Sequence, residues 1–61
     1  MQDLSAKLEK LRSEAEDCEL IASMATDIKK RTLFARLALD LRIMARDVEA
    51  MIAARRATET K

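Results

Sequence analysis

Apolar residues recur along the first half of the chain at alternating spacings of four and three residues, which is the repeat of a helix packed along one seam. These positions are Leu4, Leu8, Leu11, Ala15, Cys18, Ala22 and Ala25. A second series follows at Phe34, Ala38, Leu41, Ala45, Val48 and Ile52. Because the chain contains no Gly and no Pro to interrupt either series, the pattern predicts two long α-helices.

The expected connection between the helices is Thr26-Asp27, since both side chains are good N-caps and the apolar repeat resumes directly after them. We predict helices over about residues 3–25 and 28–57, with a frayed end beyond the second. A connection of two or three residues forces consecutive helices to lie antiparallel. The expected fold is therefore all-α, a single domain over residues 1–61 formed by an antiparallel two-helix hairpin.

Charge is distributed unevenly along this hairpin, although the formal net charge is only +1. Acidic residues crowd the end of the first helix and basic residues the start of the second, where each helix dipole disfavours them. Folding at residues 26–27 is expected to bring the two clusters level, with Asp17 near Arg36, and so to offset that conflict. The acidic cluster is Glu14, Glu16, Asp17 and Glu19, and the basic cluster is Lys29, Lys30, Arg31 and Arg36.

The apolar face of the second helix spans about 140° at 100° per residue, which is more than one neighbouring helix covers. Met51 and Ile52 are moreover expected to overhang the first helix. We therefore predict a homodimer of hairpins that forms a four-helix bundle, with a three-hairpin or mixed bundle as alternatives. The predicted self-association residues are Leu8, Leu11, Cys18, Phe34, Leu37, Leu41, Met44, Val48, Met51 and Ile52.

The composition argues against catalysis. The chain has no His to act as a general base, no Gly for a phosphate-binding loop, and a single Cys, Cys18, which we expect to be a packed thiol on the seam. Its carboxylates fall mostly off the two seams, so no inward metal-binding cluster is expected. We predict a protein that is not an enzyme and that needs no cofactor or metal.

Membrane association is not expected either. The longest apolar run, residues 20–25, is far too short to span a bilayer. No basic segment followed by an apolar core opens the sequence, as a signal peptide would require. A cytoplasmic protein is the resulting prediction.

One surface of the second helix has a composition typical of protein interfaces. Leu39 and Ile43 lie opposite the main apolar face at a spacing of four residues, and Arg36, Arg42 and Arg46 flank them. Because arginine pairs well with carboxylates, we predict that these five residues bind an acidic amphipathic helix of another protein. The alternatives are two isolated surface aliphatics or a packing surface in a larger bundle.

Three short motifs lie within about residues 8–56. They are Leu11-Arg12-Ser13-Glu14-Ala15-Glu16-Asp17-Cys18, then Ala25-Thr26-Asp27 with Lys30-Arg31, then Leu33-Phe34-Ala35-Arg36-Leu37-Ala38. In these motifs the chain resembles an uncharacterised family of short alphaproteobacterial helical-hairpin proteins. The resemblance implies a hairpin fold and carries no particular activity. The family pattern is often polar in the middle of the second helix, where this chain has Leu39 and Ile43.

In length and expected architecture the chain also resembles the Rop-type dimeric four-helix bundles, which bind RNA. Arg36, Arg42 and Arg46 would contact phosphates in such a complex. No aromatic side chain is free to stack on bases, however, because the single one, Phe34, lies on the seam. An RNA-binding regulatory dimer is therefore the alternative to a protein adaptor, together with a small structural subunit of a larger assembly.

Overall fold

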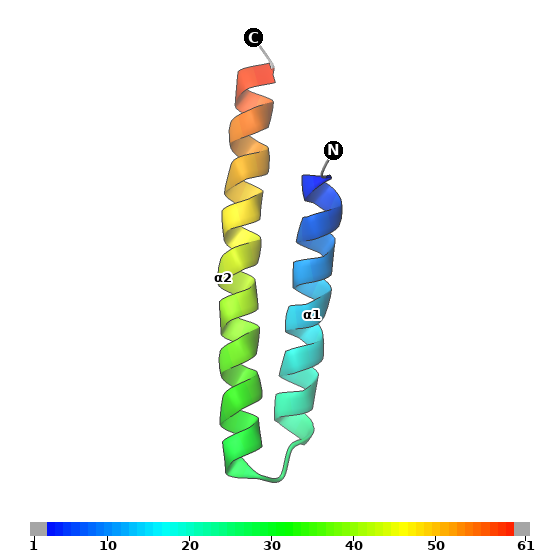
Figure 1. Ribbon diagram of the computed structural model, residues 1–61, viewed down its shortest axis with the longest axis vertical. Coiled ribbons are helices and arrows are strands. Elements are labelled where there is room, and N and C mark those ends of the chain that lie inside the picture. Colours follow the sequence, from blue (N-terminus) through cyan, green and yellow to red (C-terminus); the bar gives the residue numbers. More distant parts are fainter. Residues whose placement is uncertain (1–2, 60–61) are drawn as a thin grey trace.

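The protein is a two-helix hairpin. The computed structural model describes residues 3–59, in which helix α1 (Leu4–Met24) and helix α2 (Ile28–Glu59) are joined by residues 25–27. The two helices lie side by side and antiparallel, and α2 extends past the first residues of α1 (Figure 1). The resulting rod measures 52 × 16 × 15 Å. The predicted all-α antiparallel hairpin is confirmed.

Capping side chains mark where both helices begin. The Asp3 carboxylate accepts a hydrogen bond from the Ser5 backbone N–H at 3.0 Å, and the Asp27 carboxylate accepts one from the Lys29 backbone N–H at 3.1 Å. Each bond satisfies an amide that has no partner within its own helix. The connection has three residues rather than two, because the backbone is already extended at Ala25, and α2 continues two residues beyond the predicted end at residue 57.

The contact between the helices uses the two apolar series that the sequence predicts. Within residues 3–58, every member of these series is buried or half-buried, and all other side chains are exposed. The most enclosed side chains are small, with Ala15 at 0% exposure and Ala38 at 3%, so the backbones approach closely along much of the seam. Toward the free end of α1, Leu11 and Val48 pack with Ala45 in a cluster.

The register between the helices differs from the expected one. The cross-helix ion pairs join Glu19 to Arg42 and Arg12 to Glu49, whereas the sequence analysis placed Asp17 level with Arg36. Side chains lean toward the N-terminus of their own helix, which is away from the turn for α1 and toward the turn for α2. Each α1 side chain therefore meets an α2 residue that lies farther from the turn. The connection, residues 25–27, also lets α2 begin below the end of α1 (Figure 1).

Because of this difference in register, the prediction that Met51 and Ile52 overhang α1 is wrong for Ile52. Ile52 is half-buried and packs with Leu4 and Leu8 against the Leu11 cluster. It therefore needs no second molecule to cover it. Met51 is half exposed, because it lies one position away from the seam.

Candidate protein-interaction surfaces

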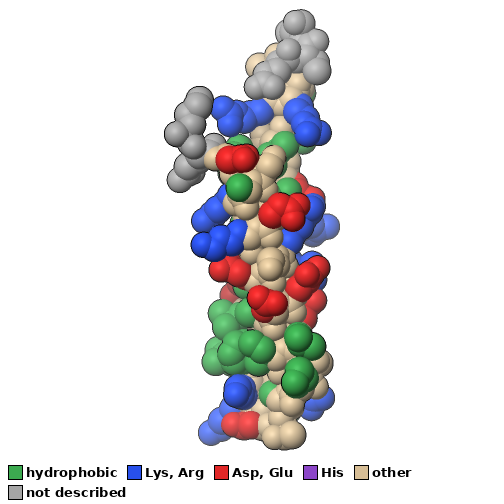
Figure 2. Space-filling view, turned by 90° about the vertical axis from the view of Figure 1, so that its right-hand side faces the viewer, with side chains coloured by type: hydrophobic (Ala, Val, Ile, Leu, Met, Phe, Trp, Pro, Cys, Tyr) green, Lys and Arg blue, Asp and Glu red, His purple; other side chains and the backbone are tan. Residues whose placement is uncertain are grey.

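The hairpin leaves most of its large hydrophobic side chains in contact with solvent. The buried residues are four alanines, Leu11 and Val48. Ten larger side chains are at least 38% exposed: Leu20, Ile21, Met24, Ile28, Leu33, Leu37, Leu39, Ile43, Met44 and Met51. Figure 2, which views the hairpin from the side of α1, shows large hydrophobic groups gathered in the half nearer the turn. Exposed apolar surface of this extent marks interaction sites.

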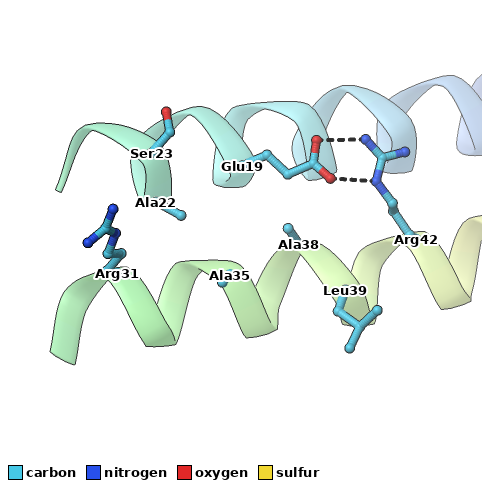
Figure 3. Close-up of a pocket in the computed structure, with 8 residues that line it drawn as sticks. All are labelled: Glu19, Ala22, Ser23, Arg31, Ala35, Ala38, Leu39 and Arg42. Atoms are coloured by element: carbon cyan, nitrogen blue, oxygen red, sulfur yellow. Dashed lines mark hydrogen bonds and ion pairs between the residues drawn. The ribbon is translucent and has the colours of Figure 1, made fainter. Parts of the chain in front are cut away.

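Four of the five predicted partner-binding residues lie on the outer face of α2 and form no ion pair with α1. We use the name outer face for these four residues, Arg36, Leu39, Ile43 and Arg46, all of which are exposed. Leu39 and Ile43 are 60% and 50% exposed, and Figure 3 shows the Leu39 side chain directed away from α1. Within residues 3–59, neither Arg36 nor Arg46 has an ion-pair partner.

Arg42, the fifth predicted residue, is instead committed to α1. Its Nε and a terminal guanidinium nitrogen donate hydrogen bonds to the two Glu19 carboxylate oxygens at 2.7 and 2.8 Å (Figure 3). This hydrogen bonding, with the attraction between the charges, lowers the pKa of Glu19 and raises the pKa of Arg42. The fork-shaped pair joins the two helices at this level of the seam. Arg42 therefore belongs to the hairpin itself more than to a free binding face.

The two sides of the seam differ in chemistry. One side, here called the polar side, carries the Glu19–Arg42 pair and the Arg12–Glu49 pair. Figure 3 shows a shallow groove on this side, lined by Glu19, Ala22, Ser23, Arg31, Ala35, Ala38, Leu39 and Arg42.

The other side of the seam, here called the apolar side, has a second groove. It is lined by Glu14, Asp17, Cys18, Leu37, Asp40, Leu41 and Met44. Leu37 and Met44 lie beside the seam residue Leu41 on this side of α2, whereas Arg42 lies on the other side. This placement follows from the rotation of 100° per residue along the helix. None of the three carboxylates has an ion-pair partner within residues 3–59.

The predicted self-association residues divide into three groups in the structure. Leu11 and Val48 are buried inside the single hairpin. The half-buried members, at the margins of the same seam, are Leu8, Cys18, Phe34, Leu41 and Ile52. The exposed members are Leu37, Met44 and Met51. The packing of the hairpin thus already uses much of the predicted set, and these last three remain free to contact a second molecule.

Sequence reasoning did not assign three of the exposed hydrophobic residues to any surface. Leu20 and Met24 form an exposed pair on α1, and Ile28 is exposed at the start of α2. The sequence does contain a signal for their exposure, because all three are large apolar residues at positions outside both seam series. Leu20 and Met24 belong to the apolar run that was considered only as a membrane segment.

Other kinds of site are not found in the part of the chain that the structure describes. Within residues 3–59, no three His, Cys, Asp or Glu residues are placed to hold a metal ion. Cys18 is a free, half-buried thiol. Neither helix, within the same residues, has an apolar stretch long enough to cross a membrane.

Comparison with known proteins identifies no relative. No protein-family model matches the chain, and neither the curated proteins nor the solved structures give a significant match. The function must therefore be inferred from the surfaces of the hairpin.

Proposed function

We propose that the protein is a non-enzymatic interaction module of the cytoplasm, which self-associates into a helical bundle and binds another protein through the outer face of α2. The observation that carries this proposal is the exposure of Leu39 and Ile43, at 60% and 50%. The seam is filled without them, so the fold of the single chain gives no reason for two large aliphatic residues at these positions. An adjacent pair of this kind is a suitable anchor for a partner helix.

The charges on the outer face favour an acidic partner. Arg36 and Arg46 flank the apolar pair and have no ion-pair partner within residues 3–59. Guanidinium groups bind carboxylates through paired hydrogen bonds and are common in protein interfaces. A helix with apolar residues at spacings of three and four, flanked by Asp or Glu, would satisfy both the apolar anchor and the two arginines.

Affinity capture of the tagged protein from its own cells, with and without nuclease, tests this function. The informative variant is Leu39→Gln/Ile43→Gln, which removes the apolar anchor without changing the net charge. The matched control is Leu20→Gln/Met24→Gln, which changes a similarly exposed pair on α1. We expect one stoichiometric acidic protein that survives nuclease, is lost with the first variant and is retained with the control.

Two results would contradict the proposed function. RNA recovered in place of protein, bound through the arginines without need of Leu39 or Ile43, would instead support the RNA-binding alternative. Equal loss of the captured protein in both double variants would show that the outer face has no special role. Circular dichroism of each variant separates loss of binding from loss of helix.

A further inference from the structure

A stripe of exposed apolar residues runs along the apolar side of α2. Its members are Leu33, Leu37, Met44 and Met51, which are 56%, 40%, 45% and 50% exposed. Their spacing of four and seven residues keeps them on one side of the helix, adjacent to the seam. We call this set the side stripe. Its apolar residues are distinct from those of the outer face, because Leu39 and Ile43 lie on the opposite side of α2 from α1. Arg36 lies between the two surfaces and borders both.

Charged residues border the side stripe along its edge away from the seam, and their sign changes once along this edge. Lys29 and Arg36 lie toward the turn, whereas Asp40 and Asp47 lie toward the end of α2. Within residues 3–59, none of these four side chains has an ion-pair partner. On the polar side, by contrast, two cross-helix pairs form within the chain. In the structure of the single hairpin these two positive and two negative groups thus remain unpaired within residues 3–59.

We propose that a second copy of this chain covers the side stripe, with the two α2 helices antiparallel about a two-fold axis near residue 38. Lys29 and Asp47 are equally far from residue 38, about 14 Å along the helix at 1.5 Å per residue. Arg36 and Asp40 are also equally far from it, at about 3 Å. An antiparallel two-fold therefore places each base of one copy beside an acid of the other.

The apolar residues fit the same axis. Leu37 lies next to residue 38, so the two copies of Leu37 meet close to the axis. Leu33 and Met44 lie at nearly equal distances on either side of it, so each Leu33 meets Met44 of the second copy. One two-fold axis thus pairs Leu33, Leu37 and Met44 with apolar residues and all four charged residues with opposite charges. Met51, about 20 Å from the axis, lies beyond the first residue of the second copy's α2.

A parallel arrangement would bring like charges together. Residues at the same height meet when two hairpins lie side by side with their turns at the same end. The carboxylates of Glu14, Asp17 and Asp40, which line the groove on the apolar side, would then face the same three carboxylates of the second copy. Like charges that face each other across a helical interface are destabilising. The charge pattern therefore selects the antiparallel dimer.

This inference rests on the self-association part of the proposed function and specifies its geometry. It is tested by sedimentation equilibrium on the full chain and on three charge variants: Arg36→Glu, Asp40→Arg and the double swap Arg36→Glu/Asp40→Arg. Each single change turns two symmetry-related attractions into repulsions, so we expect the dimer Kd to rise about tenfold. The double swap restores opposite charges and is expected to return the Kd to within about threefold of the original value.

The matched control is Arg31→Glu, which makes the same charge change at a similar height on the polar side. It is expected to leave the Kd unchanged. In a parallel dimer each residue meets its own counterpart, so Arg36→Glu and Asp40→Arg would each exchange one pair of like charges for another and leave the Kd unchanged, and that result would overturn the proposal. A chain that stays monomeric at up to about 1 mM would also overturn it. Neither of these two results would affect the capture of a partner protein through Leu39 and Ile43. The dimer geometry and the partner-binding function can therefore fail independently.

Discussion

A matched pair of substitutions tests whether the two faces of the hairpin differ as the structure indicates. Leu11→Ala and Leu39→Ala make the same chemical change on different faces. Leu11 is 7% exposed and packs in the cluster with Ala45 and Val48, whereas Leu39 is 60% exposed. The free energy of unfolding should therefore fall much more for the first variant than for the second.

The magnitudes follow from the buried methylene groups. Leu→Ala removes the equivalent of about three methylenes, each contributing about 0.8 kcal/mol when buried. Nearly all of this is lost at Leu11, and the unfilled cavity brings the cost to about 2–5 kcal/mol. Less than half is lost at Leu39, with no cavity, so the cost there is about 1 kcal/mol or less. For a chain of this size, 1 kcal/mol shifts Tm by about 4–8 °C.

Thermal and urea unfolding followed by circular dichroism, at one fixed protein concentration, measure both variants. The expected result is a fall in Tm of at least about 10 °C for Leu11→Ala and less than about 8 °C for Leu39→Ala. If Leu11→Ala is unfolded at all temperatures, Leu11→Val and Leu39→Val replace the two variants, and the change at Leu11 should still cost more than the change at Leu39. Equal costs at the two positions would refute the reasoning, because Leu39 would then be part of a packed core.

Three further predictions concern the turn, the ion pair and the seam. Asp27→Ala removes the cap of α2 and should destabilise the hairpin by about 1 kcal/mol in urea unfolding. The partner arginine of Glu19 lowers the pKa of this carboxyl group below the ordinary value of 4.5. The ion pair therefore stabilises the fold above pH 4.5, and this contribution is lost as the pH falls through the lowered pKa. The difference in unfolding free energy between the wild type and Glu19→Gln should shrink in acid for this reason. Ala15→Leu overpacks the most enclosed position of the seam and should cost about 1–3 kcal/mol by the same unfolding assay.

The sequence alone was sufficient to predict the fold and its core. Seam positions such as Leu11, Ala15, Ala38 and Val48 were predicted from spacing, because a helix buries one stripe and the alternating repeat identifies it. The predicted last residue of each helix differs from the observed one by one or two positions. Local propensity does not decide whether Ala25 closes a helix or opens a turn.

The register and the role of Arg42 could not be predicted in the same way. Counting residues from the turn placed Asp17 opposite Arg36, but side-chain direction and the path of residues 25–27 decide the actual level. Arg42 was assigned to the outer face from its position in the sequence. Its pairing with Glu19 depends on how the two helices are rotated relative to each other, which becomes visible only when both are placed.

Hydroxyl-radical footprinting over a range of protein concentrations tests the central claim most directly, because it reports the exposure of each side chain. We predict that Leu11 and Val48 are protected at every concentration, whereas Leu39 and Ile43 react at every concentration. Leu33, Leu37 and Met44 of the side stripe should react in dilute solution and become protected as the concentration rises. A side stripe that reacts equally at all concentrations, or a Leu11 that reacts as readily as Leu39, would contradict the account.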